Sequence, residues 1–172
     1  MMQIDRRGSA MDLTQTHTYD APLDAVLDML ANRDAIIDRY AGMGHRDITV
    51  TACERTDDAI RTATSRVVEV DLPGFAKKVL SPTNTMQQTD TWNRDGDTWT
   101  GVFAVEVRGA PVKISGTMKL AGAADTTAHT VTIKIDVKVP LIGGKIADWM
   151  GKNDAKRTLE EEFAAGDRWL KQ

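Results

Sequence analysis

KVPLIGGKIADWM, the stretch Lys138–Met150, contains the change of pattern that decides the fold. Residues up to Val139 alternate between apolar and polar side chains, as in a β-strand, whereas the apolar residues after the glycine pair recur at helical spacing. Pro140 ends strand pairing because it has no N–H group, and the two glycines permit the backbone angles of a tight reversal. The stretch therefore predicts that the last strand gives way here to a helix from about Lys145.

Gly143, Gly144 and Lys145 do not meet the requirements of a phosphate-binding loop. That motif, G-x-x-x-x-G-K-[ST], needs an earlier glycine and a hydroxyl directly after the lysine. Val139 stands at the first glycine position, and Ile146 follows the lysine. We therefore interpret the segment as a corner. Its helix N-terminus could favour an anionic head group, and a solvated Lys145 is the simpler alternative.

Upstream of the corner, apolar residues recur with a period of two from His45 onward. Polar or glycine-containing turns interrupt this pattern at Asp57-Asp58, Asp95-Gly96 and Gly109-Ala110-Pro111. The pattern predicts an antiparallel meander of strands over residues 46–55, 59–70, 84–94, 97–108, 111–121 and 127–139.

The N-terminal part adds one strand and two short helices. Met11–Tyr19 alternates and has a threonine-rich outer face, which predicts a strand. Pro22 is typical of a helix start, and a second short helix is expected to stop at Gly42-Met43-Gly44. We expect residues 1–10 to be a flexible N-terminal extension and residues 11–172 to form a single domain.

Residues 145–172 have the pattern of a helix, but their apolar face is not straight. An early apolar group around Ile146 and a late one around Phe163 lie roughly 120° apart if each residue advances by ~100°. Gly151 stands where the face changes, and glycine in a helix interior costs about 1 kcal/mol relative to alanine. The sequence leaves open a continuous, kinked helix and two helices that meet near Gly151.

The composition is that of an ordinary globular domain, with 41% hydrophobic and 27% charged residues and a formal net charge of −3. No basic stripe suits nucleic acid. The single cysteine, Cys53, cannot form an internal disulfide and fits a reducing compartment. No signal peptide and no long apolar run is visible. We expect a cytoplasmic protein without a nucleic-acid partner or stable membrane association; the oligomeric state stays open.

The predicted order of elements is α+β: one strand, two short helices, six antiparallel strands and a long C-terminal helix. In this order the chain resembles the START-like, or birch-pollen-allergen-like (SRPBCC), superfamily and its helix-grip fold. The segments LPGFAKKVL, DTW, VPLIGGKI and RWL resemble an actinobacterial START-like family of unknown function. The resemblance implies a curved seven-stranded antiparallel sheet wrapped around the long helix. It also implies a cavity that holds an apolar small molecule in many relatives and performs cyclisation or hydrolysis in a few.

The inward-facing residues of the predicted strands and the start of the last helix are expected to line this cavity. Most of them are apolar. The few polar ones either form hydrogen bonds with one another or with water, or they orient a ligand. The predicted lining residues are Gln15, His17, Gln88, Asp90, Trp92, Trp99, Phe103, Val105, Ile114, Met118, His129, Ile133, Ile146, Trp149 and Met150.

His17 and His129 are candidates for a pair, because the resemblance implies that the first and last strands are neighbours. Two histidines are one ligand short of a typical catalytic zinc site, and no HExxH or CxxC spacing supplies a third. Asp90 and Glu54 lie on separate strands, with no visible nucleophile beside them. We therefore predict no metal, no cofactor and no catalytic residue.

The segment Leu72–Pro82 interrupts the meander and carries Phe75, Val79 and Leu80 beside a lysine pair. We interpret these three apolar residues as a lid over the cavity mouth. A static plug and a gate that opens to admit a ligand are both compatible with this pattern.

The favoured function is non-catalytic binding or transport of a hydrophobic or amphipathic small molecule, such as a lipid or a polyketide. It predicts a cavity near the ~300 Å³ lower bound of ligand pockets. An enzyme of the polyketide cyclase or hydrolase type is an alternative, which needs His17, Asp90 or His129 to converge within hydrogen-bond reach. A protein-interaction module is a third possibility and needs an exposed apolar patch.

Overall fold

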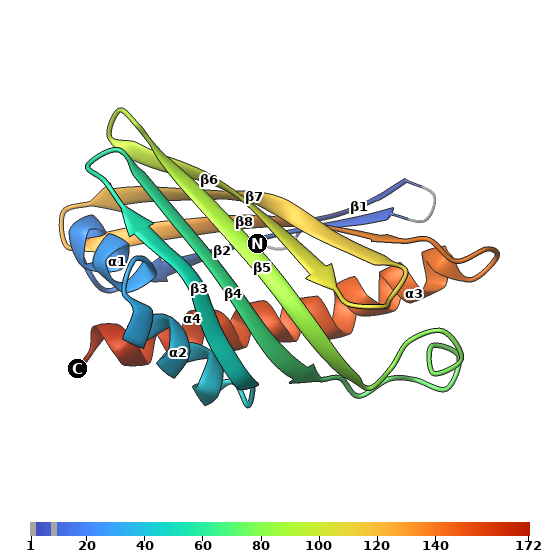
Figure 1. The fold of residues 1–172 in the computed structure, drawn as a ribbon. Coiled ribbons are helices and arrows are strands. Elements are labelled where there is room, and N and C mark those ends of the chain that lie inside the picture. Colours follow the sequence, from blue (N-terminus) through green and yellow to red (C-terminus); the bar gives the residue numbers. More distant parts are fainter. Residues whose placement is uncertain (1–2, 8–9) are drawn as a thin grey trace.

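A curved antiparallel sheet and one long helix packed against its face make up the fold (Figure 1). The structure is a computed structural model that describes residues 3–7 and 10–172. The described strands are β1 (Gln3–Arg7), β2 (Ala10–Tyr19), β3 (Arg46–Arg55), β4 (Ala59–Glu69), β5 (Thr83–Asp95), β6 (Thr98–Val107), β7 (Val112–Ala123) and β8 (Thr126–Val137). The helices are α1 (Leu23–Leu30), α2 (Arg33–Gly42), α3 (Gly143–Trp149), the π-helical segment η1 (Met150–Ala155) and α4 (Lys156–Leu170).

This arrangement confirms the predicted helix-grip fold. The seven predicted strands correspond to β2–β8, α1 and α2 lie between β2 and β3, and the long helix follows β8. The described sheet contains an eighth strand, β1, which was not predicted from the sequence. β1 comes from the expected N-terminal extension, residues 1–10, and pairs with β2 at the sheet edge.

Strands β2 and β8 lie side by side, as the resemblance implied, and their register places His17 opposite His129. The outer face of this pair is polar, and the hydroxyl groups of Thr14 and Thr132 are hydrogen-bonded at 3.0 Å. The inner face of β8 is buried at every second residue. Since alternate residues of a strand share one face, these buried side chains form a wall toward the helix, which is apolar from Val131 to Val137.

The two ends of the molecule differ in what closes them (Figure 1). At one end, α1 and α2 lie beside the C-terminal part of α4. At the other end lie α3 and the loop between β4 and β5, drawn in green. The space between sheet and helix is thus covered by helices at one end and by a loop at the other.

The corner after β8 differs in detail from the prediction. The helix begins at Gly143, two residues earlier than expected, and Gly143 N–H donates to the carbonyl of Val139 at 3.0 Å. The left-handed backbone angle falls on Leu141, with φ of 71°, and on neither glycine. Leu141 is fully exposed, at 104%. Gly143 is buried at the helix start, and the exposed leucine carries the left-handed turn.

The C-terminal helix is continuous from Gly143 to Leu170 and includes a π-helical turn, η1. On a regular α-helix at ~100° per residue, the buried residues of α3 and α4 would face directions roughly 135° apart. A π turn holds about one residue more than an α turn, so the residues after it fall back by ~100°. The π turn therefore brings both buried faces to the same side of the helix. Of the two predicted alternatives, the continuous helix is correct.

Candidate functional site

A cavity of about 120 Å³ lies between the sheet and the η1–α4 part of the helix. Its apolar wall consists of Val68, Met86, Phe103, Val105, Ile114, Met118, Val131, Ile133, Ile135, Met150, Ala155, Leu159 and Phe163. Successive inward positions of β6, β7 and β8 supply most of these side chains, as strand alternation requires. The volume is below the expected ~300 Å³ lower bound. In this conformation the cavity is too small for a complete lipid.

The remaining wall residues are polar and come from β2, α2, the turn before β3, β4, β5, β8, η1 and α4. They are Tyr19, Arg39, His45, Arg66, Gln88, Asp90, His129, Asp154, Thr158 and Glu162. Arg39, Gln88, Asp90, His129 and Glu162 also line a neighbouring cavity of about 30 Å³. That volume is about that of one water molecule in the liquid. The large apolar cavity therefore ends in a small polar one.

Arg66 is fixed by contacts with all three of its side-chain nitrogens. Nε donates to Nδ1 of His45 at 3.2 Å, Nη1 to the hydroxyl of Thr64 at 3.1 Å, and Nη2 to Oε1 of Gln88 at 2.8 Å. The guanidinium also lies over the Tyr40 ring, 4.0 Å from its centroid. Arg66 is thus a fixed positive charge in the wall, because its nitrogens are already engaged.

Asp90 continues this network on β5. Nε2 of Gln88 donates to Oδ1 of Asp90 at 2.8 Å. Burial raises the pKa of Asp90 to about 6, because loss of water disfavours the charged carboxylate, although the Gln88 hydrogen bond and the charges of Arg66 and Arg39 oppose this effect. Asp90 is therefore mainly ionised at neutral pH and takes up a proton in mildly acidic solution.

Arg39 and His129 are buried and incompletely paired, with exposed fractions of 6% and 7%. Nη1 of Arg39 lies 3.9 Å from Oε1 of Glu162, but its Nε has no hydrogen-bond partner among the described residues. Neither ring nitrogen of His129 has a partner there either. The His129 ring lies 5.6 Å from the Trp92 ring and 5.5 Å from the Phe163 ring. Burial lowers the pKa of His129 to about 3, so this histidine is neutral at physiological pH.

His17 lies outside the cavity wall, although it faces His129 in the register. Its Nε2 lies 3.0 Å from Oδ1 of Asp167, and its ring stacks on Phe163 at 4.9 Å. No hydrogen bond among the described residues joins His17, Asp90 and His129 to one another. The convergence that the cyclase or hydrolase alternative needs is therefore not present in this arrangement.

The predicted lining residues divide into three groups. The main cavity wall contains Gln88, Asp90, Phe103, Val105, Ile114, Met118, His129, Ile133 and Met150, and Trp92 lines the adjoining small cavity. Five predicted residues lie outside both walls: Gln15, His17, Trp99, Ile146 and Trp149. A side chain that faces inward does not always line a cavity, because much of the inner face packs directly against helices.

The other predicted residues outside the two walls have different surroundings. Trp99 borders a surface groove beside α1, and Trp149 borders a small cavity under the β4–β5 loop. Ile146 is fully buried in the core. Oε1 of Gln15 is buried without a hydrogen-bond partner among the described residues.

Several wall residues were missed by sequence reasoning. Arg66 follows Ile60, Thr62 and Thr64 at intervals of two in β4, so alternation alone contained the signal that it points inward. Arg39 had no comparable signal, because a charged residue on a short helix is usually exposed. The helix residues Leu159 and Glu162 reach the cavity only because η1 rotates α4.

Comparison with family models gives one match, to the family described as "Protein of unknown function (DUF2505)", over residues 14–170. The chain belongs to this family. No curated protein is similar enough in sequence to the DUF2505 chain to count as a match.

Several solved structures have a similar fold. TTHA0849 from Thermus thermophilus is 12% identical to this DUF2505 chain, with a TM-score of 0.63. The match covers 92% of this chain and 96% of TTHA0849. A STAR-related lipid transfer protein from Xanthomonas axonopodis is 13% identical over 99% of each chain, with a TM-score of 0.60. Human STARD10 is 10% identical over 96% of this chain and 72% of its own, with a TM-score of 0.57. The DUF2505 protein therefore has the START-like fold that its sequence resembled.

The predicted lid, Phe75, Val79 and Leu80, lies in the loop between β4 and β5 and packs against the core. All three side chains are half-buried. Nζ of Lys145, on α3, lies 4.2 Å from the centroid of the Phe75 ring. Leu80 also borders the small cavity beside Met150. The loop thus closes the α3 end of the space between sheet and helix.

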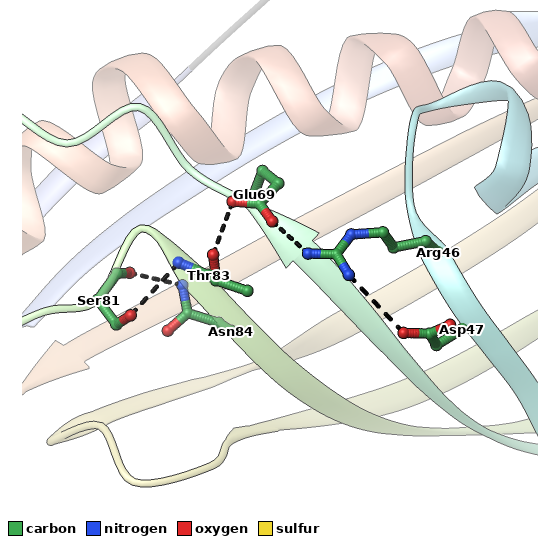
Figure 2. Close-up of polar contacts among 6 residues, drawn as sticks. All are labelled: Arg46, Asp47, Glu69, Ser81, Thr83 and Asn84. Carbon is green, nitrogen blue, oxygen red and sulfur yellow. Dashed lines mark hydrogen bonds and ion pairs between the residues drawn. The ribbon is translucent and has the colours of Figure 1, made fainter.

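Figure 2 shows how the base of this loop is held. Glu69 at the end of β4 accepts hydrogen bonds from Arg46 of β3 and from the hydroxyl of Thr83 at the start of β5. The Arg46 hydrogen bond keeps the pKa of Glu69 below its ordinary value. Asn84 donates to the backbone carbonyl of Ser81 at 2.8 Å. Three strands are therefore joined where the loop leaves and re-enters the sheet.

The described surface has few exposed large hydrophobic side chains. They are Ile37 of α2, Val102 of β6 and Leu141 in the turn between β8 and α3. Within residues 3–7 and 10–172, no three metal-binding side chains gather at one place. In the same part of the chain, no helix combines the length and apolar character needed to cross a membrane.

Proposed function

We propose that this DUF2505 protein binds or carries a hydrophobic or amphipathic small molecule, without converting it, in the cavity between its sheet and its C-terminal helix. The observation that supports this proposal is the wall of the cavity: it is mainly apolar, and five of its polar side chains also line the adjoining small cavity. This combination is typical of small-molecule sites. The name of the Xanthomonas lipid transfer protein, which has the same fold, agrees with an apolar ligand.

The size of the cavity limits what it holds without rearrangement. An apolar cavity of roughly 150 Å³ accommodates benzene, so the volume of about 120 Å³ here suits a ligand of similar size. A lipid or a polyketide would need η1 and α4 to move away from the sheet. Small aromatic molecules are therefore the first probes to test.

The methionines of the chain provide a direct test of binding. Met86, Met118 and Met150 line the cavity, whereas Met29 is buried elsewhere in the core, and Met43 packs in a separate cluster with α2. In a titration of methyl-labelled protein with toluene, followed by NMR, we expect saturable shifts of the three cavity methyl groups. The signals of Met29 and Met43 should stay in place and thus serve as internal controls.

Val131→Phe places additional volume in the cavity and should abolish the toluene-dependent shifts, because Val131 is a buried part of the wall. An unchanged Met29 signal would indicate that the variant is folded. If toluene moves all methionine signals alike, or moves none of them in the original protein, the proposed cavity is not a binding site.

A further inference from the structure

The polar end of the cavity contains three buried nitrogen atoms without hydrogen-bond partners among the described residues. They are Nε of Arg39 and both ring nitrogens of His129. Both side chains are more than nine-tenths buried, and both line the main cavity and its small polar extension. Buried polar atoms in proteins are nearly always paired, so a group of unpaired ones at one cavity end requires an explanation.

The hydrogen-bonding capacity of these atoms defines a complementary group. A neutral histidine has one N–H donor and one acceptor nitrogen, and Nε of Arg39 is a donor only. His129 is neutral because its burial keeps its pKa near 3. A group between the two residues must accept a hydrogen bond from Nε of Arg39, and it must also donate one where His129 presents its acceptor nitrogen. A hydroxyl group does both, whereas a carboxylate only accepts and a hydrocarbon does neither.

The charges around this end also favour a neutral group. Besides Asp154, which is paired with Arg157 at 3.2 Å, the charged side chains of the wall are the guanidinium groups of Arg39 and Arg66 and the carboxylates of Glu162 and Asp90. The closest contacts among these four groups are the 3.9 Å pair between Arg39 and Glu162 and the hydrogen-bonded path from Arg66 through Gln88 to Asp90. These four charges sum to zero when both carboxyl groups are ionised. A bound carboxylate would add an uncompensated buried charge, and a hydroxyl would not.

We infer that the cavity selects a small hydrophobic alcohol or phenol, whose hydroxyl group lies between Arg39 and His129 while its hydrocarbon part occupies the apolar wall. This inference rests on the proposed function and adds the chemical class of the ligand. Phe103, Ile114 and Ile133 belong to the apolar part of the wall, and the volume of about 120 Å³ suits a single aromatic ring.

Three probes of similar shape test the inference on the unmodified protein by calorimetric titration. p-Cresol and p-xylene differ only by a hydroxyl in place of a methyl group, and 4-methylbenzoate carries a negative charge instead. We expect p-cresol to bind more tightly than p-xylene by about tenfold or more, and 4-methylbenzoate to bind most weakly, because a site built for a hydroxyl rejects analogues that lack it.

Two histidine variants locate the preference within the cavity. His129→Leu should reduce the advantage of p-cresol over p-xylene to less than about threefold, since the partner of the hydroxyl is lost. His17→Leu is the matched control: His17 faces His129 in the register but lies outside the wall, so this variant should keep the preference.

The outcomes separate the inference from the proposed function. Equal affinity for p-cresol and p-xylene, or tightest binding of 4-methylbenzoate, would overturn the hydroxyl site and leave the binding function intact. A preference that survives in His129→Leu would also overturn it. If none of the three probes binds to the unmodified protein, the proposed function fails and the inference fails with it.

Discussion

Gly151 and Met11 meet where η1 passes over β2, and this contact leaves no room for a larger residue. A Cβ atom on Gly151 would lie 2.0 Å from Sδ and 2.6 Å from Cε of Met11, which is itself only 1% exposed. Overpacking of this kind costs about 1–3 kcal/mol, more than the ~1 kcal/mol that alanine gains over glycine in a helix. We expect Gly151→Ala to lower the free energy of unfolding by about 1–2 kcal/mol, measured by urea denaturation.

A second substitution makes this test specific. In a Met11→Ala background the obstructing atoms are absent, so Gly151→Ala should be neutral or stabilising there. Equal stability of Gly151→Ala and the original protein would show that the helix does not approach β2 this closely.

The polar residues of the cavity show how far single residues are predictable. Asp90 and His129 could be predicted because strand alternation assigns them to the inner face. The absence of partners for His129 could not, because it depends on which side chains the folded chain brings to the ring. Arg39 could not be predicted either: its burial results from the packing of α2 near α4.

Among the secondary-structure elements, the strands were predictable and the π turn was not. Alternation and turn residues determine β3 to β8 locally, so their bounds match the predicted ranges within a few residues. The sequence did reveal that the apolar face of the last helix changes direction. The π turn η1 accommodates this change of direction, because the helix packs on both sides of it. No local sequence pattern marks such a turn. β1 was not predictable either, because it forms by pairing with the edge strand β2.

The β4–β5 loop allows a prediction about its role as a plug or a gate. Hydrogen bonds join its two ends, including Val70 N–H to the Pro82 carbonyl at 2.7 Å, and Phe75 packs against the core. We therefore expect a static plug. Phe75→Ala should lower the free energy of unfolding by about 2 kcal/mol, because a half-buried ring is lost, without changing the rate of p-cresol entry in stopped-flow measurements.

Lys77→Ala, an exposed change in the same loop, is the control and should alter neither quantity. Entry of p-cresol that becomes more than about tenfold faster in Phe75→Ala would identify the loop as a gate instead.

The molecule as a whole combines a regular apolar sandwich of sheet and helix with a polar interior at one end. The order of elements predicted the α+β class, and the resemblance implied the sheet wrapped around the helix and a cavity between them. The volume of about 120 Å³ was not predictable, since it depends on how closely Leu159 and Phe163 approach the sheet. The polar interior also makes the stability of the whole protein depend on pH.

Asp90 provides the clearest prediction of this dependence. Its pKa is raised to about 6 in the folded protein, compared with an ordinary value of 3.8, so between these pH values the folded state binds more protons at this site than the unfolded state does. The contribution of Asp90 therefore destabilises the protein increasingly as the pH rises from about 4 to 6, reaching about 2–3 kcal/mol above pH 6. Asp90→Asn keeps an oxygen that accepts from Gln88 and removes this cost.

Urea denaturation at several pH values should thus find Asp90→Asn more stable than the original protein by about 2–3 kcal/mol at pH 8, and equally stable near pH 4. The comparison between variants is needed because His45 and His129, whose pKa values are lowered to about 4 and about 3, reduce the stability of both proteins as the pH falls below 6.5. Asp97→Asn changes an exposed aspartate and should give no such difference. A constant offset between Asp90→Asn and the original protein at all pH values would mean that Asp90 is not buried as a charged group in the cavity wall.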